Sequence, residues 1–272
     1  MNYYKICITA PEEEQDVIIA LLSANGYDAF EQDKFGLKTY QQEAHFKEHI
    51  LKELATELEF TYKKKVIPNQ NWNALWESNF QPIQIHDFCA IRADFHPANT
   101  SVKHEIVIHP KMAFGTGHHE TTFMMMSTME TIPFANKKVL DYGCGTGILA
   151  ILAAKLEADT VQAIDIDPLS YENTLENIEK NQSEGIHTML GELEKMSDSD
   201  FDIILANINR NVIIANLPTL FSKLRPDGLL LISGILQTDE TLVTSHIKNA
   251  GFLVLDTLNK GEWLCIKLKK QG

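Results

Sequence analysis

The glycine-rich segment at residues 139–147 limits the possible folds of this 272-residue chain more than any other feature. A short apolar run ends in Asp141, three glycines follow at alternate positions, and the next segment, Ile148–Leu156, is apolar with helical spacing. Glycines let a loop adopt positive φ angles and let its backbone approach a ligand closely. This strand, loop and helix predict a nucleotide-like ligand bound at an open α/β sheet.

The spacing of the glycines separates two classes of ligand. A dinucleotide fingerprint, G-x-G-x-x-G, would need a glycine at position 148, where this chain has Ile148. The observed pattern, D-x-G-x-G-x-G, resembles motif I of methyltransferases that depend on S-adenosyl-L-methionine (SAM). An NAD-dependent oxidoreductase is therefore a disfavoured alternative.

Composition places the chain among ordinary globular proteins, with 44% hydrophobic and 22% charged residues. Its apolar runs are far shorter than the roughly 20 residues that a membrane span needs, and its first residues lack the pattern of a signal peptide. The four cysteines are far apart and form no C-x-x-C pair, so neither a zinc site nor a disulfide framework is indicated. We expect a cytoplasmic protein that contacts no membrane.

The formal net charge of −13 argues against a protein that binds DNA or RNA through phosphate contacts, because such proteins normally carry a basic patch. The acidity is compatible with a basic protein partner, since opposite fields speed the encounter. The charge alone fits equally well a protein whose acidity only aids solubility.

Residues 1–67 show an alternation of short strands and amphipathic helices. The expected order is β-α-β-β-α-β, which is the ferredoxin-like pattern. The strands are expected at 3–9, 27–31, 36–41 and 60–67, and the helices at 11–24 and 45–58. A small domain of this kind more often binds a partner than catalyses a reaction.

Residues 68–100 lack periodicity and hold three prolines, with Trp72, Trp76 and Phe80 between the first two. We interpret this segment as a linker that contains a short helix at Asn71–Glu77. Aromatic side chains at this spacing more often dock a linker onto a domain than bind a ligand.

Residues 101–272 alternate between strands and helices, which predicts a mostly parallel sheet with helices on both faces. Eight strands are expected, at 102–108, 138–142, 160–165, 186–190, 201–207, 228–234, 252–259 and 263–268. Only Lys260–Glu262 connects the last two strands, so the final strand should run antiparallel. Class I methyltransferases end in this way, whereas plain dinucleotide-binding domains usually do not.

Ligands of open α/β sheets lie beyond the carboxyl ends of the strands. Asp165 closes the strand after the glycine loop, where a carboxylate can accept both ribose hydroxyls of a nucleotide. Asn207 closes a later strand, and its amide oxygen can accept a hydrogen bond from a substrate amine. Asp167 and Asn209 fit helix N-caps better than ligand contacts.

Amino methyltransferases commonly continue from the position of Asn207 with Pro-Pro-Tyr, whose aromatic ring stacks on a planar amide or base. This chain continues with Ile208-Asn209-Arg210. The missing prolines and aromatic residue disfavour a DNA adenine or glutamine acceptor and leave room for a tetrahedral amine, such as a lysine or an N-terminus.

Four segments together resemble the methyltransferases of large-subunit ribosomal protein L-eleven. They are Met112–Thr122, Asp141–Gly147, Ile164–Asp167 and Asn207–Ile208. The least generic part is Ala113-Phe114-Gly115-Thr116-Gly117. The resemblance covers essentially the whole chain and implies a substrate-recognising domain at 1–67, a linker at 68–100 and a class I catalytic domain at 101–272.

The resemblance also implies roles for residues that match the motifs of the family. The positions implied to bind SAM are Gly117, Thr122, Asp141, Gly143, Gly145, Gly147, Asp165 and Asn207. Asn207 and Phe114 are the implied catalytic residues, and Phe114 and Gly117 belong to an active-site loop. His118, His119 and Glu120 replace the common Thr-His-Pro of the family. They lack metal-ligand spacing, so we expect no metal.

These observations predict an α/β class I SAM-dependent methyltransferase with an N-terminal ferredoxin-like α+β domain. The expected reaction is methyl transfer from SAM to lysine or N-terminal amines of ribosomal protein L-eleven. One alternative is methylation of another protein or of RNA. A binding module without activity is a further alternative, although Asp165 and Asn207 are both present.

Overall fold

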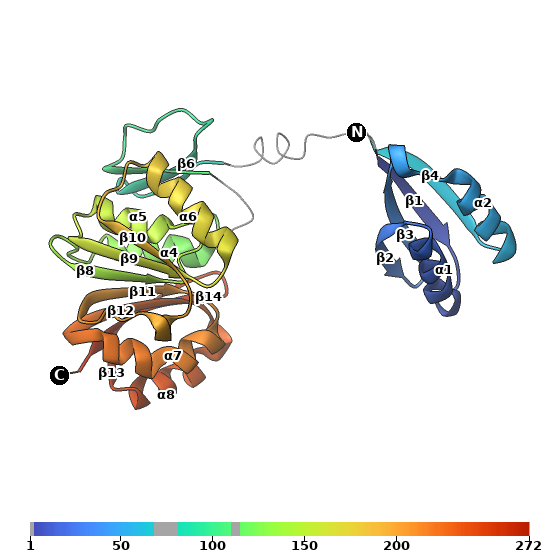
Figure 1. The fold of residues 1–272 in the computed structure, drawn as a ribbon. Helices are drawn as coiled ribbons and strands as arrows, with labels where there is room; N and C mark the ends of the chain where they lie inside the picture. Colours follow the sequence, from blue (N-terminus) through green and yellow to red (C-terminus); the bar gives the residue numbers. More distant parts are fainter. Residues whose placement is uncertain (1–2, 68–80, 110–114, 272) are drawn as a thin grey trace. The chain divides into compact units, whose positions relative to one another are not determined.

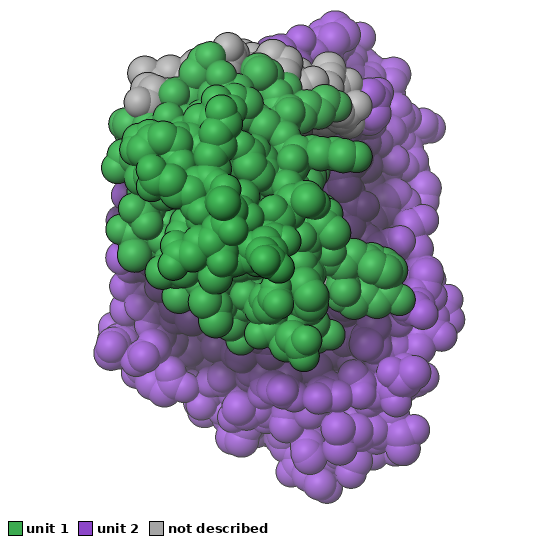
Figure 2. All heavy atoms as spheres, turned by 90° about the vertical axis from the view of Figure 1, so that its right-hand side faces the viewer, with its two compact units in different colours: residues 1–80 green, residues 81–272 purple. Residues whose placement is uncertain are grey.

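The computed structural model describes residues 3–67, 81–109 and 115–271. The chain forms two compact units, residues 1–80 and 81–272, which Figure 2 shows in separate colours. The expected linker helix at Asn71–Glu77 and the expected active-site residue Phe114 lie outside the described residues. No helix of the described part is long and apolar enough to cross a membrane.

Unit 1 has the predicted β-α-β-β-α-β order, which confirms its ferredoxin-like pattern (Figure 1). The four strands form one antiparallel sheet in the order β2-β3-β1-β4. Its elements are β1 (Tyr3–Thr9), α1 (Glu12–Ala24), β2 (Asp28–Asp33), β3 (Gly36–Gln42), α2 (Glu48–Glu57) and β4 (Thr61–Ile67). Ile6 and Ile8 of β1 share a core with Leu22 and Leu51, so both helices cover the same face of the sheet.

Unit 2 is built on a seven-stranded sheet in the order β10-β9-β8-β11-β12-β14-β13. The strands are β8 (Lys138–Tyr142), β9 (Thr160–Asp165), β10 (Ile186–Leu190), β11 (Phe201–Asn207), β12 (Leu224–Leu236), β13 (Phe252–Lys260) and β14 (Trp263–Lys270). Strand β14 is antiparallel to both of its neighbours, while the other pairs are parallel. The predicted antiparallel final strand is therefore confirmed.

Five helices pack on this sheet. They are α4 (Glu120–Met129), α5 (Ile148–Lys155), α6 (Pro168–Lys180), α7 (Arg210–Lys223) and α8 (Glu240–Asn249). Helices α5 and α6 contact the β8–β10 part of the sheet, whereas α7 and α8 contact β11–β13 (Figure 1). Helix α5 follows the glycine loop directly and is apolar on every side because it is almost wholly buried.

The expected linker extended to residue 100, but residues 81–100 contain two strands of unit 2. Strands β5 (Ile83–Ile85) and β6 (Cys89–Ala93) form a second sheet with β7 (His104–Ile108). Four of the five side chains of β6 are buried. Pro82 and Pro97 flank these strands instead of interrupting them, and the strands are short, so the sequence showed little periodicity there.

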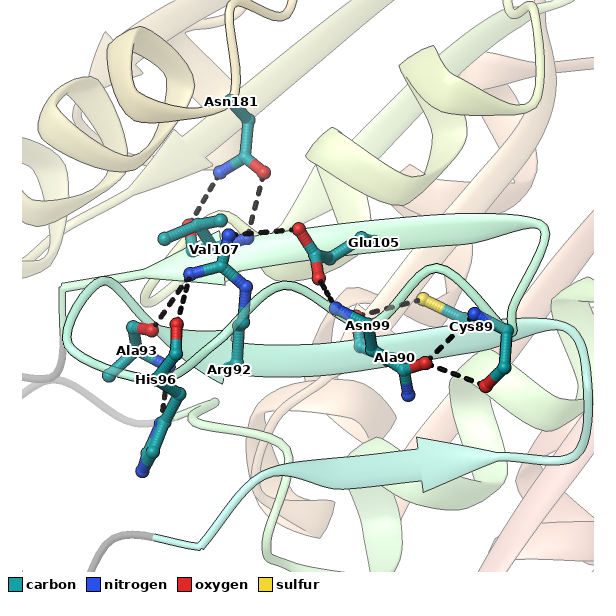
Figure 3. Close-up of polar contacts among 10 residues, drawn as sticks. Cys89, Ala90, Arg92, Ala93, His96, Asn99, Glu105, Val107 and Asn181 are labelled. Carbon is teal, nitrogen blue, oxygen red and sulfur yellow. Dashed lines mark hydrogen bonds and ion pairs between the residues drawn. The ribbon is translucent and has the colours of Figure 1, made fainter.

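Three asparagines bond the open edge of β7, two of them in helix α6 and the third, Asn181, at its C-cap; Figure 3 shows the contact of Asn181. The Asn181 amide bonds both the N–H and the C=O of Val107, at 2.9 and 2.6 Å. Asn177 accepts from the N–H of His109 at 2.7 Å, and Asn173 donates to its C=O at 3.0 Å. Residues four apart on a helix are separated by about 6 Å along its axis, and residues two apart on a strand by about 6.6 Å. Amides four residues apart along the helix can therefore bond alternate residues of the strand.

Candidate functional site

A cavity of about 410 Å³ lies in unit 2 at the carboxyl ends of β8, β9, β11 and β12. This is the position at which open α/β sheets bind their ligands. The residues that line it are His119, Thr121, Tyr142, Gly143, Gly145, Asp165, Ile166, Ser170, Asn207, Ile208, Asn209, Val212, Gly234 and Trp263. Four of the sequence-predicted residues therefore meet at one cavity, namely Gly143, Gly145, Asp165 and Asn207.

The glycine loop presents its backbone to this cavity. Gly143, Gly145 and Gly147 all have positive φ angles, of 74°, 57° and 76°. A side chain at Gly143 would collide with the Ile208 side chain, so only glycine leaves this part of the loop open. Gly147 does not line the cavity; it precedes α5 and packs against Thr174.

Asp165 is held in place by backbone donors. Its Oδ2 accepts from the N–H of Gly145 at 2.9 Å, and its Oδ1 accepts from the N–H of Asp167 at 3.0 Å. Each carboxylate oxygen has a further lone pair, so the group can also accept from two hydroxyls of a ligand in the cavity. Asp167 accepts from the N–H of Ser170 and caps α6, as the sequence predicted.

Asp141 connects the strand before the glycine loop to the helix after it and does not line the cavity. Its side chain is buried, and its Oδ2 accepts from the N–H of Ala150 in α5 at 3.0 Å. The pKa of the Asp141 carboxyl is raised to about 7, chiefly by burial and to a lesser extent by the charge of Asp165, while the Ala150 N–H opposes the shift. The carboxyl joins the end of β8 to the first turns of α5.

Asn207 lines the cavity at the end of β11. Its Nδ2 donates to Thr122 Oγ1 at 3.3 Å, which fixes the orientation of the amide. Its Oδ1 is buried and has no hydrogen-bond partner among the described residues. A buried acceptor without a partner is costly, and an amine donor in the cavity would remove that cost. Thr122 is itself buried behind Asn207, and its neighbour Thr121 lines the cavity.

Trp263 and Gly234 are among the residues of the cavity wall that were missed in the sequence. Trp263, the first residue of β14, packs against His119 with ring centroids 4.9 Å apart at 66°. Gly234 has a φ of 88° at an irregularity in β12, and a side chain there would collide with the Ile208 backbone. A glycine inside an apolar strand is a recognisable signal of close approach. Trp263 gave no signal because its partner lies more than a hundred residues away.

The two histidines before α4 make hydrogen bonds that fix the local backbone. His119 accepts from the N–H of Thr121 and caps α4, while His118 Nε2 bonds the C=O of Gln81 at 2.9 Å. Gly117 lies against Ile91 of the small sheet and does not line the cavity. Among the described residues, no three His, Cys, Asp or Glu side chains form a group that could hold a metal ion.

The sheet order, the antiparallel β14, the glycine loop and the acidic end of β9 together define a class I SAM-dependent methyltransferase. The model of the family "Ribosomal protein L11 methyltransferase (PrmA)" matches residues 6–271. The chain belongs to this family.

Relatives and a solved structure agree with this assignment. Ribosomal protein L11 methyltransferases are 38% identical in Porphyromonas gingivalis, over 94% of this chain and 91% of the relative, and 37% identical in Phocaeicola vulgatus, over 98% and 99%. The crystal structure of a ribosomal protein L11 methylase from Lactobacillus delbrueckii subsp. bulgaricus is similar with a TM-score of 0.65. It is 29% identical, and the match covers 71% of this chain and all of that one.

Proposed function

We propose that this protein transfers methyl groups from SAM to amines of ribosomal protein L11, on lysine side chains or on the N-terminus. The observation that carries the proposal is Asn207, a residue of the cavity wall whose buried Oδ1 has no hydrogen-bond partner among the described residues. The names of the relatives support the protein substrate. A cytoplasmic location follows from that substrate and is part of the proposal.

The cavity fits SAM through the groups that line it. The Asp165 carboxylate would accept the two ribose hydroxyls, and the backbone at Gly143 and Gly145 leaves room for the rest of the nucleoside. We assign Asp141, Gly147 and Thr122 to the support of these groups, since none of the three lines the cavity. Bound SAM supplies a methyl group that its sulfonium already activates, so the protein needs to position the two reactants.

Asn207 would orient the acceptor amine. An amine that donates one N–H to Asn207 Oδ1 has the direction of its lone pair restricted, and the Thr122 contact keeps the amide from rotating. The Trp263 ring, held by His119, forms an apolar wall that excludes water from this end of the cavity. Orientation and exclusion of water are the two contributions that the described residues make to an in-line transfer.

The amine must lose its proton before it attacks. For a lysine with a pKa near 10.4, this costs about 4–5 kcal/mol at pH 7, at 1.36 kcal/mol per pH unit. The positive sulfonium and the apolar wall both lower the pKa of the amine, because each disfavours the charged form. His119 Nδ1 accepts from the Thr121 N–H, so the neutral ring carries its proton on Nε2 and is not arranged as a general base there.

We assign recognition of the protein substrate to unit 1, within the expected boundaries 1–67, and the chemistry to the cavity of unit 2. The ferredoxin-like unit has its own core, and the described residues that line the cavity belong to unit 2. Phe114 and Gly117 remain proposed as parts of an active-site loop, and Gly117 would act by anchoring this loop on β6 through Ile91.

Intact-mass analysis of purified ribosomal protein L11 tests the proposal. After incubation with the protein and SAM, the mass should rise in steps of one methyl group. Replacing Asn207 with alanine should lower kcat about 100-fold, comparable to loss of one preorganised hydrogen-bonding group. Asn211, an exposed amide on α7, provides the matched control variant. An unmodified L11 alongside methylated RNA or another methylated protein would refute the substrate assignment.

A further inference from the structure

The face of the unit 1 sheet that points away from the helices carries four lysines, which we call the lysine face. They are Lys5 on β1, Lys38 on β3, and Lys63 and Lys65 on β4. Side chains alternate between faces along a strand, and residues directly opposite one another share a face. Lys5 lies opposite both Tyr40 and Lys65, and Cys7 lies opposite both Lys38 and Lys63. The lysines therefore form two short rows across the sheet.

The three consecutive lysines of β4 show how the faces differ. Lys64 points to the helix side, where its ammonium lies 2.8 Å from Glu48 of α2. Lys63 and Lys65 are exposed on the opposite face. Among the side chains that the structure describes, no carboxylate lies within ion-pair distance of either one. At the other edge of the lysine face, Glu31 lies 3.7 Å from Lys38 and offsets its charge.

The lysine face is an electrostatic cost to the folded domain. Like charges directly opposite on a sheet are destabilising, and Lys5 faces Lys65 in this way. The helices carry the opposite charge, since α1 begins with three consecutive glutamates and α2 begins with Glu48. Unit 1 is therefore bipolar, although the whole chain has a net charge of −13. Folding alone gives no reason to gather cations on one face, whereas an anionic ligand does.

We propose that the lysine face binds the phosphate backbone of single-stranded RNA. Two arguments favour RNA over an acidic protein surface. The ammonium groups arise at residues two apart on neighbouring strands, so the charge repeats every 6–7 Å or so along the sheet, which suits a chain of regularly spaced phosphates. The rows also include Tyr40, whose ring is 5.8 Å from the Lys5 ammonium, and aromatic residues beside cations on an open sheet stack unpaired bases.

This inference goes beyond the proposed methylation and stands independently of it. A substrate whose reactive groups are amines would be attracted to the acidic helix layer and repelled by the lysine face. The two faces of unit 1 could therefore engage an amine-bearing protein and a polyanion at the same time. The negative net charge of the chain does not exclude binding of a polyanion, since binding depends on the local field of the lysine face.

Fluorescence anisotropy with a short labelled oligouridylate and the full chain tests the proposal. Three or four phosphate contacts predict a slope of about −2 to −3 in a plot of log affinity against log salt, at −0.7 per contact for single strands. The double variant Lys63→Gln/Lys65→Gln should reduce the slope by about 1.4 and weaken binding about 25-fold near 0.1 M salt. Tyr40→Leu should weaken binding while leaving the slope unchanged, because it removes stacking and no charge.

The matched control is Lys47→Gln/Lys52→Gln, which removes the same charge from the helix side of the same unit. It should leave both affinity and slope near the values of the unaltered chain. Equal losses in the two double variants would show that only net charge matters and would overturn the proposal. So would absence of oligouridylate binding. A rise in KM for the protein substrate in Lys63→Gln/Lys65→Gln, without any change in RNA binding, would assign the lysine face to a protein partner instead.

Discussion

The raised pKa of Asp141 predicts that replacing this residue with asparagine changes the pH dependence of stability. An acid whose pKa is 3.8 when unfolded and about 7 when folded takes up a proton on folding between these values. Its ionisation destabilises the folded state increasingly as pH rises from 3.8 to 7, by 1.36 kcal/mol per unit and about 4 kcal/mol in full. Asparagine keeps an oxygen for the Ala150 N–H but cannot ionise.

Between pH 5 and pH 8 the free energy of unfolding falls by about 3 kcal/mol through this carboxyl, since about two pH units of that range lie below its folded pKa. Asp141→Asn should therefore be more stable relative to the unaltered protein at pH 8 than at pH 5, by about that amount. The new amide N–H₂ group adds a cost of its own in the folded state, and because the group is uncharged this cost is independent of pH. The test therefore rests only on how the stability difference between variant and unaltered protein changes from pH 5 to pH 8.

Urea unfolding without ligand measures this difference. Trp263 fluorescence reports unit 2 in a background in which Trp72 and Trp76 are replaced with phenylalanine. Asp256→Asn, at an exposed position on β13, is the control and should show no comparable pH dependence. A stability difference for Asp141→Asn that is the same at both pH values would refute a raised pKa and the burial argument behind it.

Substitutions at three further residues probe the cavity. Asp165→Ala should weaken SAM binding about 1,000-fold in calorimetry, since two hydrogen bonds to a charged acceptor contribute about 1.5–3 kcal/mol each; wild-type affinity would contradict the ribose assignment. Trp263→Ala should lower kcat and raise KM for the protein substrate in steady-state assays, whereas Trp263→Phe should retain most activity if the ring acts as an apolar wall. Gly234→Ala should lower the thermal midpoint by about 6–12 °C, from some 3 kcal/mol of strain and collision; an unchanged midpoint would show that β12 relaxes freely.

The sequence predicted the parts of the site that depend on local geometry. The positive φ angles of the loop require glycine whatever surrounds them, so the loop is visible in the residues themselves. Asp165 is visible for a similar reason, because its place at a strand end follows from the alternation of strands and helices. The strand and helix order of unit 1 and of the seven-stranded sheet in unit 2, with its antiparallel β14, followed from periodicity and loop length, whereas β5 and β6 did not.

The parts that the sequence could not predict depend on distant partners. Trp263 acquires its position through β14, which inserts between β12 and β13. The asparagines of α6 look like ordinary polar residues until the edge of β7 lies beside them. The lysine face was concealed because Lys63 and Lys65 alternate with Lys64, and because the charge of the whole chain has the opposite sign. Charge summed over a sequence does not report the field of one face.

Helix α6 connects the two loops that the proposed reaction needs. Beside its contact with His109, Asn177 donates to the C=O of Thr146 in the glycine loop at 2.8 Å. Thr174 donates to the C=O of Gly145 at 2.8 Å, and Thr146 Oγ1 donates to the C=O of Gly115 at 2.7 Å. The segment that precedes α4 and the loop that would hold SAM are thus fixed to the same helix face. Because the Asn177 amide bonds both His109 and Thr146, a ligand that binds at the glycine loop is coupled to the segment before α4, and this coupling is reciprocal.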